Sequence, residues 1–189
     1  MLDWFLIRRE HRELVAAAAD AAKSVLNPDQ FSASAKHVVE RFGSRALKLR
    51  RRLHKPPARP PEFDNENATT AFCTWMSIWQ TTILEVFFHL RGSAINAVHR
   101  IAFGPHDWPH ANALAVLCRW SVEGMDRDQT IAAIARVLPR LDDECTFALA
   151  EWLAKRSKSD MRYSEIVATL RSVSTFEEAW REAVRPVTD

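Results

Sequence analysis

The spacing of apolar residues in the first third of the chain predicts two amphipathic helices. Between residues 1 and 26, apolar and aromatic side chains recur every three or four positions, with arginines between them. The repeating positions are Trp4, Ile7, His11, Leu14, Ala18 and Val25. Proline disfavours helical geometry in the residue before it, so Asn27-Pro28 should end this helix. A second helix is expected from Ser32 or Ser34, either of which suits an N-cap, to about His54. Its apolar stripe is Val39, Phe42, Ala46, Leu49 and Leu53.

A proline-rich stretch follows the second predicted helix. Four prolines lie within residues 56–61, where they cannot continue a helix and favour an extended polyproline conformation. We therefore predict three parts: a helical hairpin over 1–55 with a basic second helix, a semi-rigid linker over 56–67, and a helical domain over 68–189.

The rest of the chain also has helical periodicity. A long apolar helix is predicted over residues 68–90, and a shorter one ends at Phe103 before Gly104. Short helices should then span about 109–123, 128–138, 143–156, 163–173 and 175–185. Their short connections indicate antiparallel neighbours.

The C-terminal half contains a weak internal repeat. Shifting Leu114–Leu138 by 35 residues superposes it on Leu149–Val173 without a gap. A period in the mid-thirties with one helical hairpin per unit is typical of α-solenoids, although any two amphipathic hairpins of equal length share apolar positions. The predicted fold is therefore an all-α multi-helix bundle with solenoid-like stacked helical hairpins in its C-terminal half.

Composition agrees with helices, and the charge is unevenly distributed. The chain has only 4 Gly among 189 residues and a formal net charge of +2. Residues 41–61 contain eight Lys or Arg and no acid, which leaves 18 basic and 24 acidic residues elsewhere, a net charge of −6. The molecule is thus a mildly acidic body with one cationic segment.

On a continuous α-helix, five of these cations would lie on one face, at positions 41, 45, 48, 52 and 55. Like charges so placed repel one another, and an anionic partner would relieve that repulsion. We expect these seven residues to bind an acidic protein surface: Arg41, Arg45, Lys48, Arg51, Arg52, Lys55 and Arg59. The alternatives are a nucleic-acid backbone, an anionic membrane surface, and a solvated face that packs on the acidic body of the same chain. No aromatic residue on the basic face is available to stack on bases, and no helix-turn-helix or zinc pattern is present, which disfavours nucleic acid.

Motifs for catalysis are missing from the sequence. It has no Gly-x-Ser-x-Gly, no glycine-rich phosphate loop and no Cys/His pair at a family spacing. Glu85, inside the apolar helix, should be buried, and a partner such as His89 would make it structural. We therefore expect a non-enzymatic chain without a cofactor.

One loop contains residue types that bind metals. His106, Asp107 and His110 could join Glu85 and His89 around a transition metal. The spacing matches no established metal motif, and Asp107 is suited to cap the helix that begins near Pro109. We therefore expect no metal site.

The remaining markers concern location and surface. Cys73, Cys118 and Cys145 are too few and too scattered for a disulfide framework and should be small buried hydrophobes in a reducing cytoplasm. Charged residues interrupt any leader-like start, and polar residues interrupt the apolar stretch over 68–90, so neither a leader nor a membrane span is expected. Four tryptophans should lie in the core: Trp75, Trp79, Trp120 and Trp152. Trp4 and Trp108 are better candidates for surface anchors.

Overall fold

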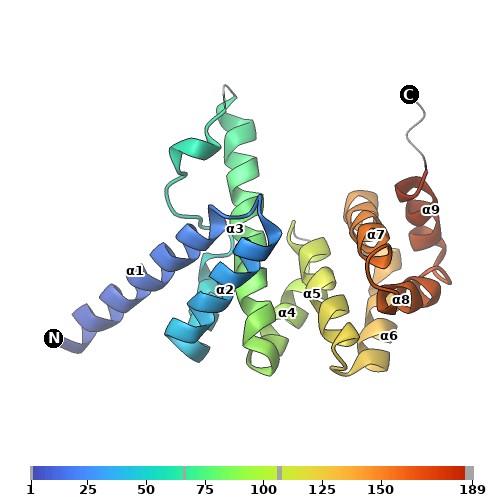
Figure 1. The fold of residues 1–189 in the computed structure, drawn as a ribbon, viewed down its shortest axis with the longest axis horizontal. Coiled ribbons are helices and arrows are strands. Elements are labelled where there is room, and N and C mark those ends of the chain that lie inside the picture. The colour runs from blue at the N-terminus through green and yellow to red at the C-terminus, as the bar shows by residue number, and fades with distance from the viewer. Residues whose placement is uncertain (1, 66, 106–107, 186–189) are drawn as a thin grey trace. The chain divides into compact units, whose positions relative to one another are not determined.

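The computed structural model describes residues 2–65, 67–105 and 108–185, and in these ranges its regular structure is entirely helical (Figure 1). The predicted all-α multi-helix fold is confirmed. The α-helices are α1 (Leu2–Ala22), α2 (Pro28–Phe42), α3 (Ala68–Leu90), α4 (Ile95–Ala102), α5 (His110–Val122), α6 (Arg127–Val137), α7 (Asp143–Ser157), α8 (Arg162–Leu170) and α9 (Ser174–Ala183). The 3-10 helices are η1 (Gly43–Arg52), η2 (Pro61–Phe63), η3 (Arg91–Ala94) and η4 (Leu138–Arg140). None of the described helices combines the length and the apolar character needed to cross a bilayer.

The chain folds as two compact units, residues 1–97 and 98–189. In the first unit, α1, α2 and α3 pack against one another, and η1 packs against all three. Its core includes Leu14 from α1, Val38 from α2 and Leu49 from η1, packed with Trp75 and Trp79 from α3. The division into 1–55, 56–67 and 68–189 stays a prediction, but the structure groups α3 with the N-terminal helices.

The second helix differs from its prediction at both ends. α2 begins at Pro28, and the side chain of Asn27, rather than Ser32 or Ser34, caps it by accepting a hydrogen bond from the Gln30 N–H. The prediction was wrong because proline fits the first turn of a helix, where its missing N–H is not needed. α2 ends at Phe42 instead of continuing to His54, because Gly43 takes φ +55°, in the left-handed region that favours glycine.

The proline-rich stretch packs against α3. The indole N–H of Trp75 donates a 3.0 Å hydrogen bond to the carbonyl of Pro57, and the ring of Phe63 stacks on that of Trp75 at 5.2 Å between centroids. Trp75 is 1% exposed. The residues predicted as a linker therefore cover one side of α3.

The second unit consists of short packed helices. α5 contacts α6 and α7, α6 contacts α8, and α7 contacts α8 and α9. The 35-residue offset also relates the helix bounds: α5 ends at Val122 and α7 at Ser157, whereas α6 begins at Arg127 and α8 at Arg162. Solenoid-like stacking stays a prediction.

The tryptophans are distributed largely as expected. Trp75, Trp79 and Trp120 are at most 2% exposed, and Trp152 is partly buried. Trp108 is 66% exposed, as predicted for a surface residue. The side chain of Trp4 lies outside the described part of the structure.

Candidate partner-binding surface

Five of the eight cations of the basic segment, residues 41–61, lie on the 3-10 helix η1 rather than on an α-helix. In a 3-10 helix, residues three positions apart lie above one another. The prediction that five cations form a single stripe on an α-helix is therefore wrong. Arg45, Lys48 and Arg51 follow the three-residue spacing and are exposed, whereas Ala46 and Leu49 are buried.

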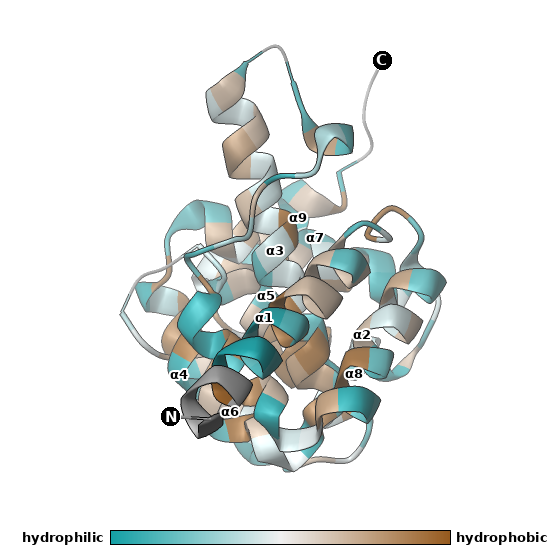
Figure 2. Cartoon of the chain, turned by 90° about the vertical axis from the view of Figure 1, so that its left-hand side faces the viewer, coloured by the Kyte–Doolittle hydropathy of each residue, from teal (hydrophilic) through white to brown (hydrophobic). Residues whose placement is uncertain are grey.

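Carboxylates of α1 neutralise part of this segment. Arg41 Nη2 lies 3.3 Å from Glu13 Oε2, Arg45 pairs with Glu10, and Lys48 Nζ lies 3.9 Å from the other oxygen of Glu10. Figure 2 shows the run of hydrophilic residues along α1 that supplies these carboxylates. At this end of the segment, the cations therefore pack against acidic residues of the same chain, which was one of the alternatives predicted from the sequence.

A hollow of about 370 Å³ lies beside these ion pairs. It is lined by Ile7, Arg9, Glu10, Glu13 and Arg45. Arg9 Nε lies 2.9 Å from Glu13 Oε1, so each charged side chain that lines the hollow already has an opposite charge nearby. The hollow offers no unbalanced charge to a ligand.

The C-terminal end of the basic segment is different. Arg50, Arg51, Arg52 and Lys55 form no ion pair with any carboxylate in the described part of the chain; we call these four the unpaired cluster. Arg50, Arg51 and Lys55 are exposed. Arg52 is partly buried, and its Nε has no hydrogen-bond partner among the described residues. Beyond the cluster, Arg59 Nε lies 2.7 Å from Asp64 Oδ1.

The cations of the unpaired cluster affect the pKa of His11, on α1. Burial lowers the pKa of His11 from 6.5, and the nearby charges of Arg52, Lys48 and Arg51 lower it further. The charges of the cluster therefore act on α1 at His11.

Hydrogen bonds from α3 hold the unpaired cluster in place. Trp79 Nε1 donates to the carbonyl of Arg52 at 2.7 Å, and Gln80 Nε2 lies 3.4 Å from His54 Nδ1. Leu53, between them, is buried. A backbone fixed in this way presents its cations without further ordering, which favours binding.

Glu85 and His89 form a second polar group, inside the first unit. Glu85 is 7% exposed, as expected, and its Oε1 lies 3.3 Å from His89 Nε2. Ser32 Oγ donates to Glu85 Oε1 at 2.9 Å and lies 3.1 Å from the same His89 nitrogen. A catalytic triad would use both ring nitrogens of the histidine, one toward each neighbour, so this trio joins α2 to α3 rather than activating Ser32.

The metal hypothesis gains no support from these positions. His106 and Asp107 lie outside the described residues, and His110 belongs to the second unit, whereas Glu85 and His89 belong to the first. Among the residues the structure describes, no three His, Cys, Asp or Glu side chains are grouped so that they could hold a metal ion.

The comparisons with known proteins give no relative. No protein-family model matches the chain, and no match was found among curated proteins or solved structures.

Sequence reasoning missed several residues of this surface. Glu10, Glu13 and His11 come from α1, and Arg50 did not fall on the predicted helical stripe. A signal for the two glutamates was present, since Glu10 and Glu13 are three residues apart on one face of an amphipathic helix that also carries basic residues.

Proposed function

We propose that this chain is a non-enzymatic interaction module that binds an acidic surface of another protein. Its binding residues are the unpaired cluster together with Lys48. Of the seven cations predicted from the sequence, Arg41, Arg45 and Arg59 are already paired with Glu13, Glu10 and Asp64 and are left out of the binding surface.

The proposal is carried by one observation: four neighbouring cations have no carboxylate partner within the described chain, on a backbone held by Trp79. Exposed like charges repel at a few tenths of a kcal/mol per neighbouring pair, and an anionic partner converts that repulsion into attraction. Three of the four are arginines, which bind carboxylates through two parallel N–H groups.

An acidic protein fits this surface better than a nucleic acid. Residues 43–55 contain no Phe, Tyr or Trp. The tryptophans behind the segment, Trp75 and Trp79, are in the core and use their N–H groups on the backbone. The surface therefore lacks the stacking platforms that single-stranded nucleic acids use.

A charge-reversal pair tests the proposal. Arg51→Glu with Lys55→Glu changes the net charge from +2 to −2, and so does the control pair Lys158→Glu with Arg185→Glu in the second unit. Binding of a 20-residue polyaspartate, measured by fluorescence anisotropy at low salt, should fall at least tenfold for the first pair and less than threefold for the control. Equal losses would mean that only net charge matters and would refute a localised site.

Capture from native lysate then identifies the class of partner. The proposal expects proteins that are retained by the wild type, lost by the Arg51/Lys55 variant and unchanged by nuclease treatment. Capture that disappears with nuclease would assign the surface to nucleic acid instead, and binding to duplex DNA should then fall steeply with salt.

A further inference from the structure

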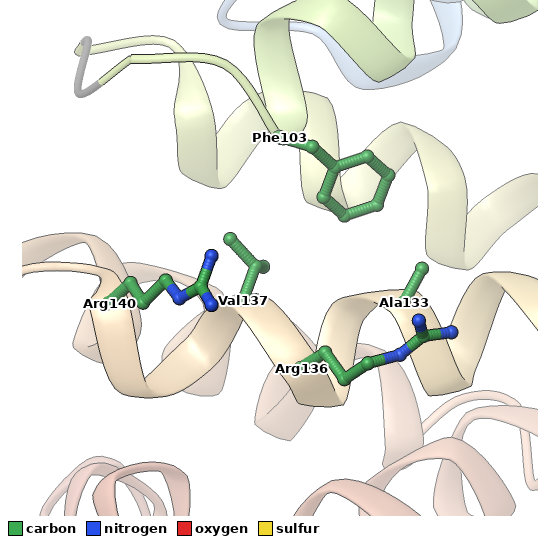
Figure 3. A pocket seen from close by; sticks show the side chains of 5 residues that line it. All are labelled: Phe103, Ala133, Arg136, Val137 and Arg140. Carbon is green, nitrogen blue, oxygen red and sulfur yellow. The ribbon is translucent and has the colours of Figure 1, made fainter.

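The second unit contains a hollow of about 370 Å³ that is separate from the basic segment. Phe103, which follows α4, forms one side of it (Figure 3). Ala133, Arg136 and Val137 of α6, with Arg140 of η4, form the other. These four positions are spaced by three and four residues and so lie on one helical face.

The hollow combines an apolar wall with unbalanced positive charge. The side chains of Phe103, Ala133 and Val137 are partly exposed within it, and the ring of Phe103 is held against that of His99 at 5.4 Å between centroids. Neither Arg136 nor Arg140 forms an ion pair with a described residue, and both are exposed.

The two guanidinium groups lie at opposite ends of the hollow, that of Arg140 beside Val137 and that of Arg136 beside Ala133 (Figure 3). Arg136 Nε donates to the carbonyl of Ala132 at 3.3 Å, within its own helix, which leaves both Nη groups of that side chain unused. Figure 3 shows the side chains of Arg136 and Arg140 beside Val137 and Ala133, along the space that Phe103 faces. Four residues apart, their positive charges reinforce one another.

We propose that this hollow binds a small organic anion, a molecule with a carboxylate head and an aromatic or aliphatic body. The carboxylate would bind one of the two guanidinium groups, which form charge-assisted hydrogen bonds with carboxylates, and the body would cover Phe103 and Val137. The volume is within the range of small-molecule sites. An inorganic anion would leave the apolar wall exposed to water, and a neutral aromatic would leave the charges unused. The two arginines and the apolar wall therefore select for a ligand with both parts.

The test uses 2-naphthoate, titrated into the full chain and followed by the backbone amide NMR signals of residues 103, 133 and 137. We expect binding at one site, at least tenfold weaker for Arg136→Gln with Arg140→Gln and unchanged for the control Arg185→Gln. Neutral 2-naphthalenemethanol and inorganic phosphate should each bind at least tenfold more weakly than 2-naphthoate.

Ala133→Leu tests the apolar part while keeping both arginines. It should weaken 2-naphthoate at least fivefold, because the added carbons fill the hollow. Equal binding by the Arg136/Arg140 variant, by the neutral compound or by Ala133→Leu would overturn the proposal. So would phosphate that binds as tightly as 2-naphthoate, or an acidic peptide that binds here when 2-naphthoate does not.

Discussion

The indole N–H of Trp79 donates a 2.7 Å hydrogen bond to the backbone carbonyl of Arg52. Trp79 is fully buried in α3, whereas Arg52 belongs to the unpaired cluster, so this bond connects the core of the first unit to its most cationic surface. The order of the binding surface is thereby linked to the packing of α3.

Replacing that donor should weaken both stability and binding. Trp79→Phe keeps an aromatic ring but removes one of the two hydrogen bonds to the Arg52 carbonyl, which also accepts from the Lys55 N–H at 2.9 Å. The lost bond and the space left by the smaller ring should together cost about 1–3 kcal/mol in the free energy of unfolding. Affinity for polyaspartate should fall about threefold, as expected for a small loss of preorganisation. Chemical denaturation and anisotropy measure the two effects.

Trp180→Phe is the matched control for Trp79→Phe. Trp180 is a partly buried tryptophan of α9 that stacks on Phe176, far from η1 in sequence. Its replacement should alter stability and leave polyaspartate affinity unchanged. A binding loss of the same size in both variants would mean that general destabilisation, rather than the Arg52 contact, is responsible.

Removing the Glu10 carboxylate, which pairs with cations of the basic segment, should strengthen anion binding. Glu10→Gln releases Arg45 and Lys48, which that carboxylate now neutralises. Affinity for polyaspartate at low salt should rise twofold to tenfold, and its salt dependence should steepen. The free energy of unfolding should change by less than about 1 kcal/mol, because exposed ion pairs contribute little. Glu151→Gln, which removes an exposed carboxylate paired with Lys155 in α7, is the control and should leave affinity unchanged.

The sequence predicted most of the helices but not this division of the cations. Apolar residues at helical spacing indicated α3 and the helices of the second unit, although α3 buries all of residues 82–88 rather than one face. The apolar spacing could not distinguish the α-helix from the 3-10 helix after Phe42, since Ala46, Leu49 and Leu53 are spaced by three and four residues and fit both. α2 ends where Gly43 takes a positive φ, and the apolar pattern does not mark that position.

The candidate sites were less predictable because they depend on tertiary contacts. The basic residue types are evident from composition, but their pairing with Glu10 and Glu13 depends on which face of α1 packs against η1. The hollow in the second unit needs Phe103 to lie across from Ala133, Arg136 and Val137, at least thirty positions later in the chain. Neither of these tertiary contacts produces a recognisable pattern in the local sequence.

Protonation of His11 should couple pH to anion binding. Burial and the neighbouring cations hold its pKa below 6.5, so the unfolded chain binds this proton more readily than the folded one. The stabilising contribution of neutral His11 is therefore complete above about pH 6.5 and is lost as pH falls toward the folded-state pKa. A bound polyanion offsets the positive charges of Arg52, Lys48 and Arg51, raises the pKa and draws a proton onto the ring. Polyaspartate affinity should thus increase as pH falls from 7.5 to 5.5.

His11→Gln provides the control for that pH effect. It should flatten the change in affinity between pH 7.5 and 5.5, whereas His37→Gln, at an exposed position on α2, should leave it intact. A pH profile that is the same with and without His11 would show that other groups are responsible.

Two glycines should respond oppositely to alanine. A Cβ at Gly104 would lie 2.3 Å from the backbone oxygen of Arg100, closer than such atoms approach in folded proteins. Gly104→Ala should therefore cost about 1–3 kcal/mol of stability as the end of α4 shifts. At Gly92 a Cβ meets nothing within 4 Å, so Gly92→Ala should be neutral or stabilise by up to about 1 kcal/mol. Thermal unfolding compares the two, and equal effects would contradict the steric argument.

The three thiols should differ sharply in reactivity because the thiolate is the reactive form. Burial raises the pKa of Cys118 to about 12 and that of Cys145 to about 11, the latter helped by the negative charge of Asp142. At pH 8 their thiolate fractions are then on the order of one in ten thousand and one in a thousand. Cys73, on α3, is only partly buried.

Ellman's reagent should modify one thiol quickly, Cys73→Ser should remove that phase, and the other two should react at the rate at which the second unit opens. A fast phase that survives Cys73→Ser would mean that α5 or α7 opens locally, because Cys118 and Cys145 lie in those helices.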